Sequence, residues 1–453
     1  MSRSGKQKPQ SDPRALAWRV LQRVEQGGYA DILLGQALSR AVLAPADRAL
    51  AVRLVYGTLA WQLYLDHLLA GFCVRPLVEL DPPIRVLLRM AMFQLCQLQR
   101  VPAFAAVDTA VELAKSYKHG AAVGLVNAVL RRAATGWQGV PLPARDRDPA
   151  GYLSVRYSHP RWLVERWLAE LGQEQTEALL RANNEPAPTT LRVNCMRAKR
   201  EEVLEALRRD GLHGVPGSFS PAAIVIGGFD PASHPLYENG RYSVQGEAAQ
   251  LVSYLVAPNP RERVLDLCAA PGGKSLHLAE LMNNQGEVVA VDTQQKGLAQ
   301  LRAEARRLGI SIVKAVLADA RGWSDPAGLF DRVLLDAPCS GLGTLRQHPE
   351  IRWRRSPESI EQLAVLQREL LEAASRHVRP GGVLVYATCT IVRAENDEVV
   401  EDFLGKHSDF VRESPPPEPV IPWPAVVDPH GALRTFPHQH GLDGFFGVRL
   451  RRV

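Results

Sequence analysis

The second half of the chain alternates short apolar segments with segments of helical periodicity, and this rhythm restricts its fold more than any other feature. The apolar segments are Val264–Leu267, Val288–Val291, Ile312–Ala318, Arg332–Leu335 and Val383–Tyr386. Such alternation predicts a mostly parallel sheet with helices on both faces. Because ligands of these sheets bind beyond the carboxyl ends of the strands, we expect the functional residues directly after these segments.

The rest of the chain divides into further domains, since 453 residues suffice for about three domains of roughly 150 residues. Residues 13–135 place apolar side chains three and four positions apart, which predicts an all-helical domain. Residues 139–149 mix proline with charge and indicate a linker, after which a short strand, helix and strand follow. We therefore expect a helical domain over residues 1–140, a linker and small α/β module over 141–245, and the parallel-sheet domain over 246–453.

Basic residues are concentrated in the first domain. Residues 1–140 contain 17 Lys and Arg against 9 Asp and Glu, a net charge of +8, whereas the remainder contains 37 against 39, which is −2. This asymmetry indicates a polyanionic partner such as nucleic acid, with solubility alone as the alternative. We expect this domain to add affinity for nucleic acid without performing chemistry.

The sequence does not indicate a membrane, disulfide or metal protein. It has no apolar run of the roughly 18 residues that span a bilayer, and Met1–Arg14 lacks the apolar core of a secretory signal. We therefore expect a cytoplasmic protein with no membrane partner. The six cysteines are spaced neither as a disulfide framework nor as metal-ligand pairs, and His438 and His440 lack further ligands at matching spacing.

A glycine-rich turn follows the first strand of the predicted sheet. It reads Asp266-Leu-Cys-Ala-Ala-Pro-Gly-Gly-Lys-Ser275 and leads into a helix, so its backbone can approach a ligand at the helix N-terminus. The turn is not a phosphate-binding P-loop, because Cys268 stands where the first glycine is needed. Asp292 closes the second strand, 26 positions after Asp266, close to the spacing at which an acidic residue binds ribose hydroxyls. The pattern favours an adenosine ligand, with a structural turn capped by an acid as the alternative.

Two cysteines follow the fourth and fifth strands. Asp336-Ala-Pro-Cys339 ends the fourth, Thr388-Cys389-Thr follows the fifth, and Asp319 ends the third. If the fourth and fifth strands are neighbours, their ends lie about 5 Å apart, and two thiols and a carboxylate face one cleft. A single buried cysteine is more often a small apolar residue, but two at the functional ends of neighbouring strands favour chemistry.

These motifs resemble those of the Sun family of S-adenosylmethionine-dependent RNA cytosine-5 methyltransferases. The resemblance is carried by residues 266–275, Asp336-Ala-Pro-Cys-Ser-Gly and Ala387-Thr-Cys-Thr. In the first domain, Gly28-Tyr-Ala-Asp31, residues 47–57 and residues 124–132 are similar to the NusB-like domain fused to the bacterial branch that acts on 16S ribosomal RNA. The similarity covers nearly the whole chain and ends with residues 434–446.

The resemblance implies an α/β fold class, in which a Rossmann-like S-adenosylmethionine methyltransferase domain is preceded by an all-helical NusB-like domain and a small α/β module. It implies transfer of a methyl group from S-adenosyl-L-methionine to carbon 5 of a specific cytosine in 16S ribosomal RNA, and we expect a monomer. The residues implied to bind the cofactor are Cys268, Ala269, Ala270, Pro271, Gly272, Gly273, Lys274, Asp292, Asp319 and Asp336. The residues implied in catalysis are Cys389, Cys339, Asp336 and Lys274.

The resemblance also gives the two thiols different roles. Carbon 5 of cytosine is too weak a nucleophile to take a methyl group unaided, but addition of a thiolate at carbon 6 makes it reactive. Cys389 would supply that thiolate, Cys339 would assist loss of the carbon-5 proton, and Asp336 would hydrogen-bond the N3/N4 edge of the base. The cytosine has to be unpaired or flipped out of its stack.

An arginine-rich segment follows Cys339. Residues 346–355 interleave four arginines with Trp353. Because guanidinium groups suit phosphate and an indole suits base stacking, the segment is predicted to be an RNA-contacting loop, with a solvated charged loop as the alternative.

Three other functions are weighed against this one. The same chemistry on tRNA is disfavoured by the NusB-like domain. A non-catalytic RNA-binding assembly or antitermination factor is disfavoured by the presence of both Cys339 and Cys389. A P-loop nucleotide hydrolase is disfavoured by Cys268 and by the lack of a second motif suited to magnesium.

Overall fold

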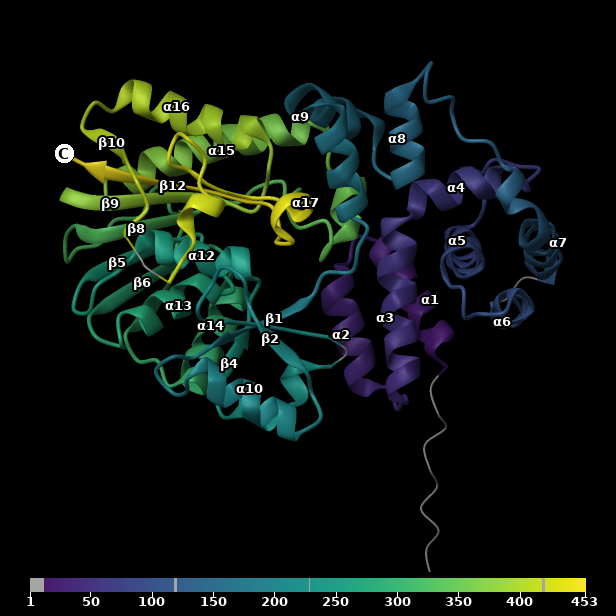
Figure 1. Ribbon diagram of the computed structural model, residues 1–453, viewed down its shortest axis with the longest axis horizontal. Helices are drawn as coiled ribbons and strands as arrows, with labels where there is room; N and C mark the ends of the chain where they lie inside the picture. The colour runs from purple at the N-terminus through teal and green to yellow at the C-terminus, as the bar shows by residue number, and fades with distance from the viewer. Residues whose placement is uncertain (1–11, 118–119, 228, 418–419) are drawn as a thin grey trace, which may run out of the picture. The chain divides into compact units, whose positions relative to one another are not determined.

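The structure is a computed structural model that describes residues 12–117, 120–227, 229–417 and 420–453 (Figure 1). The chain forms two compact units. Unit 1 consists of Met1–Pro186 and Leu345–Arg354, and unit 2 consists of Ala187–Thr344 and Arg355–Val453. The chain therefore leaves unit 2 for ten residues and then returns to it.

Unit 1 is helical, as the sequence predicts for its first part. Its helices are α1 (Pro13–Glu25), α2 (Ala30–Arg40), α3 (Pro45–Ala60), α4 (Gln62–Ala70), η1 (Leu77–Glu79), α5 (Pro82–Gln97), α6 (Ala103–Ser116), α7 (Gly120–Gly136), η2 (Trp137–Gly139), α8 (Pro149–Tyr157), α9 (Arg161–Ala182) and η4 (Pro349–Trp353). Local signals set their ends: Asp12 caps α1 by accepting the N–H of Arg14, and Pro13 occupies its first turn. The apolar faces of these helices share one core, which includes Leu21, Leu54 and Leu87.

Unit 2 begins with a small antiparallel sheet of strand order β2-β3-β1-β4. Its elements are β1 (Thr189–Val193), α10 (Arg200–Arg209), β2 (Gly214–Pro216), β3 (Ala223–Ile226), η3 (Pro231–Ser233), α11 (Pro235–Glu238) and β4 (Tyr242–Val244). The helix α10 packs on this sheet through Val203 and Leu207, which share an apolar cluster with Leu191 and Ile224. This is the small α/β module that the sequence predicts.

A larger sheet follows, with strand order β10-β12-β9-β8-β5-β6-β7 and β11 paired to β12. Its strands are β5 (Arg263–Leu267), β6 (Glu287–Asp292), β7 (Val313–Leu317), β8 (Phe330–Asp336), β9 (Val378–Thr388), β10 (Phe410–Glu413), β11 (Leu433–Thr435) and β12 (Phe445–Arg452). Strands β5 to β9 pair in parallel, whereas β12 pairs antiparallel to β9 and to β10. The prediction of a mostly parallel sheet is confirmed.

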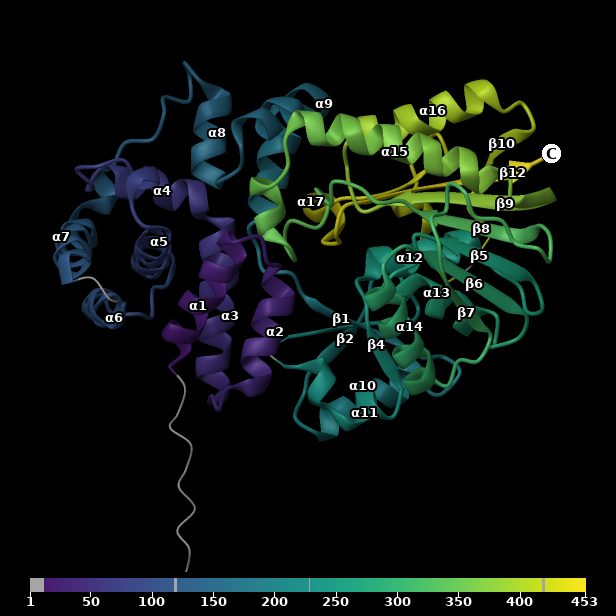
Figure 2. The ribbon, with the colours of Figure 1, turned by 180° about the vertical axis from the view of Figure 1, so that it is seen from behind.

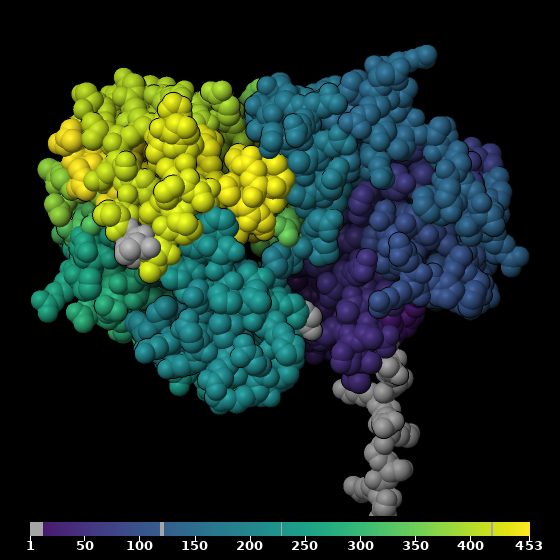
Figure 3. All heavy atoms as spheres, viewed as in Figure 1, coloured from purple at the N-terminus to yellow at the C-terminus, as the bar shows by residue number. Residues whose placement is uncertain are grey.

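Helices cover both faces of the large sheet (Figures 1 and 2). They are α12 (Glu247–Val256), α13 (Gly273–Leu281), α14 (Gln295–Leu308), α15 (Pro357–Ser375), η5 (Arg393–Glu395), α16 (Asp397–Lys406), η6 (Trp423–Ala425) and α17 (Pro437–His440). Alternate residues of β5 serve the two faces, because Leu265 shares an apolar cluster with α15 and α16, and Val264 shares another with α12 and α13. In the space-filling view the C-terminal segment, in yellow, lies at the surface on the face that is shown (Figure 3).

Residues 346–354 of the arginine-rich segment after Cys339 belong to unit 1. The prediction of an RNA contact is wrong for Arg352, which is buried, and stays a prediction for the rest of the segment. Arg352 is 0% exposed and donates hydrogen bonds to Ala60 O and Ser158 O, and also to two asparagines. Trp353 Nε1 donates to Leu59 O at 2.9 Å. The same groups that suit phosphates and bases thus bind the carbonyl groups at helix ends, because a guanidinium satisfies several acceptors at once.

Candidate active site

The glycine-rich turn links β5 to α13 at the carboxyl edge of the large sheet. Cys268 has a φ of 61° and Gly272 has a φ of 105°. A Cβ atom at Gly272 would lie 2.5 Å from Cγ of Leu301. Only glycine fits there, because both the left-handed backbone and the space exclude a side chain. The helix α13 begins at Gly273, so its first N–H groups lie next to the turn.

Asp292, at the end of β6, holds this turn in place. Its Oδ2 accepts the N–H of Ala270 at 2.9 Å, and its Oδ1 accepts the N–H of Gln294 at 2.7 Å. The N–H of Ala269 is bonded to Val291 O at 3.1 Å. Asp292 therefore has the turn-holding role that the sequence left as the alternative, and each of its oxygens has a further lone pair for a ligand.

Asp266 lies at the end of the neighbouring strand β5 and is fully buried. Its Oδ2 accepts a hydrogen bond from the hydroxyl of Ser275, in the first turn of α13. Burial raises the pKa of the Asp266 carboxyl to about 7, although the Ser275 hydrogen bond opposes the shift. Hydrogen bonds to the two carboxylates thus connect the end of β5 to the start of α13 and the end of β6 to the turn between them.

Asp319 follows β7 and is exposed. Its carboxylate is paired with the Arg321 guanidinium, with Oδ2 and Nη2 2.8 Å apart. Hydrogen bonds from the Arg321 side chain and N–H lower the pKa of Asp319 to about 2. Its contact with a cofactor stays a prediction.

Lys274 and Asp336 form an ion pair beside the turn. The ammonium Nζ of Lys274 lies 2.7 Å from Oδ2 of Asp336 at the end of β8. Burial lowers the pKa of Lys274, but the Asp336 carboxylate outweighs it, so the pKa lies above its usual value. The ammonium also lies 5.3 Å from the centre of the Phe445 ring. The structure thus brings together these two residues, which the resemblance assigns to catalysis.

The two predicted thiols meet at the ends of β8 and β9. The Sγ atoms of Cys339 and Cys389 lie 3.3 Å apart, and both cysteines are free. The hydrogen bond with Cys389, together with burial, raises the pKa of Cys339 well above its usual value. Cys339 is therefore held in its protonated thiol form.

Sequence reasoning missed the side chains that fix the Cys339 loop. Arg355 Nε donates to Ser340 O at 2.8 Å. Buried Glu395 accepts the N–H of Ser340 at 2.7 Å, and Gln367 bonds both to Glu395 and to Pro338 O at 2.9 Å. No motif spacing connects these residues with the loop, because each reaches it from a different element.

Sequence reasoning also missed a side chain that holds the glycine-rich turn in place. Arg192, on β1 of the small sheet, is 1% exposed and donates to Gly273 O at 2.8 Å. It forms an ion pair with buried Glu280 of α13, with Nη2 and Oε1 2.9 Å apart. An arginine inside the alternating apolar pattern of β1 is the one signal that could have pointed to it.

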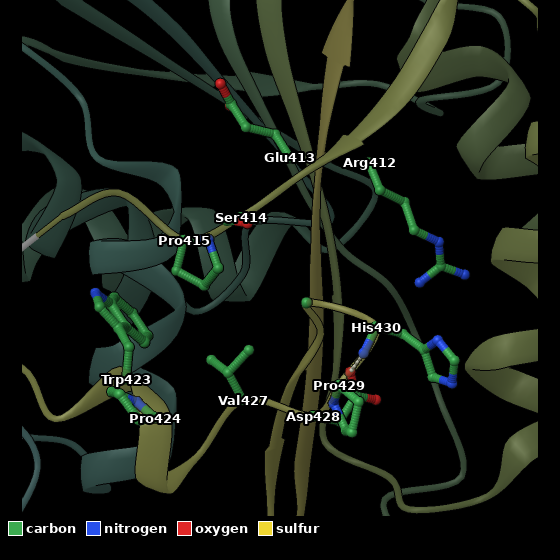
Figure 4. Close-up of a pocket in the computed structure, with 11 residues that line it drawn as sticks. Arg412, Glu413, Ser414, Pro415, Trp423, Pro424, Val427, Asp428, Pro429 and His430 are labelled. Atoms are coloured by element: carbon green, nitrogen blue, oxygen red, sulfur yellow. Dashed lines mark hydrogen bonds between the residues drawn. The ribbon is translucent and has the colours of Figure 1, made fainter.

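A separate surface pocket lies near β10 (Figure 4). Arg412 and His430 lie on one of its sides, and Trp423 lies on the other. None of the strand-end carboxylates or thiols lines it. The candidate active site is therefore the carboxyl edge of the large sheet rather than this pocket.

No helix among residues 12–117, 120–227, 229–417 and 420–453 is long and apolar enough to cross a membrane.

A parallel core with a glycine-rich turn after β5, acidic strand ends and an antiparallel edge defines a Rossmann-like methyltransferase as the class of protein. The chain matches the model of the 16S rRNA methyltransferase RsmB/F over residues 253–451. It also matches the NusB family over residues 11–135 and the RsmF/B-like ferredoxin-like domain over residues 159–231. The chain belongs to the RsmB/F family of 16S rRNA methyltransferases.

Curated relatives and solved structures agree with this family. The probable ribosomal RNA small subunit methyltransferase B of Bacillus subtilis (strain 168) is 37% identical, over 97% of this chain and 98% of its own length. The ribosomal RNA small subunit methyltransferase B of Pseudomonas syringae pv. tomato is 39% identical over 90% of each chain. Among solved structures, PH0851 has a TM-score of 0.84 and 30% identity, and covers 98% of this chain and 100% of its own. NSun6 from Pyrococcus horikoshii, solved with SFG, shares the fold with a TM-score of 0.59 at 24% identity, over 65% of this chain and 98% of its own.

Proposed function

We propose that the protein transfers a methyl group from S-adenosyl-L-methionine to carbon 5 of a cytosine in 16S ribosomal RNA, through a covalent bond between Cys389 and carbon 6 of the base. The observation that carries this proposal is the pair of thiols 3.3 Å apart at the ends of two parallel neighbouring strands. The family supports methylation of ribosomal RNA, and the thiol pair supports cytosine as the base.

The electrostatics of the turn support this cofactor. Burial raises the pKa of the Cys268 thiol above its usual value, and the four carboxylates of Asp292, Asp336, Asp266 and Asp319 raise it further. The turn therefore lies in a negative field. S-adenosylmethionine carries a positive sulfonium and a positive ammonium, whereas a nucleoside triphosphate carries several negative charges that this field would repel. When bound, the cofactor supplies an electrophilic methyl group.

The thiol pair supports Cys389 as the nucleophile. Because Cys339 is held in its protonated thiol form, we assign the attacking thiolate to Cys389, the other sulfur of the pair. That thiolate adds to carbon 6, the new bond between sulfur and carbon forms, and the electron pair of the C5–C6 double bond moves toward N3. Carbon 5 then has the electron density to take the methyl group.

Release of the product needs a base, and we assign this task to Cys339. Once Cys389 is bonded to carbon 6, its thiolate no longer raises the pKa of Cys339, which can lose its proton to water. The Cys339 thiolate then removes the proton from carbon 5, the C5–C6 double bond forms again, and the bond to Cys389 breaks. The enzyme returns to its starting state with one proton on Cys339.

We assign the binding of the cytosine base to Asp336 and Lys274. The Asp336 carboxylate can accept a hydrogen bond from the exocyclic N4 amino group while its other oxygen is held by Lys274. This fixes the orientation of the carboxylate before the base arrives, which is the preorganisation that catalysis needs.

The test is methylation of 16S ribosomal RNA by the purified full chain with a cofactor labelled in its methyl group. After digestion to nucleosides, the label is expected in 5-methylcytidine. Label in another nucleoside, or in tRNA and not in 16S ribosomal RNA, would contradict the proposal. Transfer that survives in Cys389→Ala would contradict the covalent route alone.

A further inference from the structure

Unit 1 contains a cluster of three side chains that the proposed reaction does not use. They are Asp31 in the first turn of α2, and His348 and Glu350 in the segment Leu345–Arg354. One ligand atom of each lies within 4.8 Å of those of the other two. The sequence did not suggest this site, because Asp31 is far from the other two residues along the chain.

Glu350 is the buried member of the cluster. It is 2% exposed, and its Oε1 accepts the N–H of Ala30 at 2.9 Å, at the start of α2. Its Oε2 is also buried and has no hydrogen-bond partner among the described residues. A helix N-terminus supplies only a partial positive charge, so one oxygen of this buried carboxylate lacks compensation.

His348 likewise has a buried ring nitrogen, its Nδ1, without a hydrogen-bond partner within the part of the chain that the structure describes. Asp31, by contrast, is exposed. The cluster thus combines two buried atoms that lack a hydrogen-bond partner in the described ranges and a carboxylate that is exposed to water.

We propose that Asp31, His348 and Glu350 bind one divalent transition-metal cation, with water in the other coordination positions. The cation would compensate both buried atoms at once. One imidazole and two carboxylates suit Mn²⁺, Co²⁺ or Zn²⁺, whereas Mg²⁺ prefers oxygen ligands alone. Ligand atoms bonded to one such ion lie about 3–4 Å apart, which is close to the separation of these three ligand atoms, at most 4.8 Å.

A bound cation would link two parts of unit 1. It would connect the segment that carries His348 and Glu350 to helix α2 through metal–ligand bonds. The ten-residue excursion Leu345–Arg354 begins five residues after Ser340. Metal binding is therefore expected to stabilise unit 1 without taking part in the methyl transfer.

The experiment uses the untagged full chain, freed of metal by dialysis against a chelator, and titrates Mn²⁺ by calorimetry. Mn²⁺ is the better probe because the free thiols at the active site compete for softer cations. One Mn²⁺ per chain is expected, and affinity should fall at least tenfold in Asp31→Asn and in His348→Ala. The matched controls are Asp108→Asn in α6 and His430→Ala, both exposed, which should bind as the wild type does.

Absence of binding by the wild type, or equal binding by Asp31→Asn and wild type, overturns the proposal. A thermal midpoint that rises with Mn²⁺ in the wild type and not in His348→Ala supports it independently. If His348→Ala does not fold, Asp31→Asn still decides, because Asp31 is exposed and its side chain caps no helix.

Discussion

The carboxyl edge of the large sheet has two halves that differ in what their side chains do. At the ends of β5, β6 and β7 lie the carboxylates of Asp266, Asp292 and Asp319 (the carboxylate half). At the ends of β8 and β9 lie the thiols of Cys339 and Cys389 (the thiol half). Strand β5 is the point at which the strand order reverses, with β6 and β7 on one side and β8 and β9 on the other.

The two halves also differ in the groups to which their side chains are hydrogen-bonded. In the carboxylate half, Asp292 accepts two backbone N–H groups and Asp319 accepts the N–H of Arg321. In the thiol half, the sulfur atoms meet each other, and their loop is fixed by other side chains such as Arg355 and Glu395. The carboxylates that accept backbone N–H groups fix the shape of the backbone around a binding site. The thiols are positioned by the side chains that fix their loop, so their sulfur atoms stay available for reaction. Substitutions in the thiol half should therefore change the chemistry, and those in the carboxylate half should change the affinity for the cofactor.

The largest effect is expected for Cys389→Ala. Without this thiol no bond to carbon 6 forms, so methyl transfer should fall by a factor on the order of 10⁴ or more. Cofactor affinity, measured by calorimetry, should not change. The control is Cys195→Ala, whose thiol is exposed. A Cys389→Ala enzyme that retains a tenth of its activity would show that carbon 5 is activated in another way.

The second effect is expected for Cys339→Ala, which leaves the nucleophile and removes the base. One methyl transfer per chain should still occur, but the adduct should persist, so a protein–RNA band should accumulate on a denaturing gel. Removing Cys389 as well should abolish that band. The opposite result, with the adduct in Cys389→Ala and none in Cys339→Ala, would exchange the two roles.

The third prediction concerns the carboxylate half. Asp292→Ala removes the acceptor for Ala270 and Gln294, and hydrogen bonds to a charged group contribute about 1.5–3 kcal/mol each. The dissociation constant of S-adenosylmethionine should rise roughly 10- to 100-fold, with the single-turnover rate at saturation nearly unchanged. Asp146→Ala in the exposed linker is the control. Tight binding of magnesium-ATP without binding of S-adenosylmethionine would contradict the site itself.

The fourth prediction concerns Arg355 as a positioning residue. Arg355→Met keeps the aliphatic length but loses the hydrogen bond to Ser340 O, so Cys339 should be less well placed and kcat should fall about tenfold. KM should hardly change, and Arg355→Lys should restore part of the rate. Arg393→Met, at an exposed position, is the control. An increase in KM with an unchanged kcat would mean that Arg355 binds RNA instead.

The sequence predicted that the two thiols lie side by side, but it did not predict the residues that surround them. Cys339 and Cys389 could be paired in advance because strand ends meet at one edge of a parallel sheet. Arg352 could not be placed, because an arginine beside Trp353 has the same pattern in an RNA-binding loop and in a buried segment. Its burial depends on carbonyl groups, such as Ala60 O and Ser158 O, that lie far away in the chain. The predicted domain boundaries are not tested by this arrangement. Removal of residues 1–140 would leave Arg352 without the Ala60 carbonyl, so substitutions are the better probe of RNA affinity.

The smallest effect is expected for a substitution of Asp266. It tests whether the protonated form of this buried carboxyl group stabilises the fold. The pKa of Asp266 is raised from 3.8 to about 7, so the folded chain keeps a proton between these pH values that the unfolded chain has lost. This stabilisation is complete below pH 3.8 and is lost as the pH rises through 7. Asp266→Asn, which resembles the protonated form, should therefore gain in thermal midpoint relative to the wild type between pH 5 and pH 8, by roughly 2–4 °C. Asp108→Asn should show no such change, and an equal difference between Asp266→Asn and wild type at both pH values would mean that Asp266 is already ionised at pH 5.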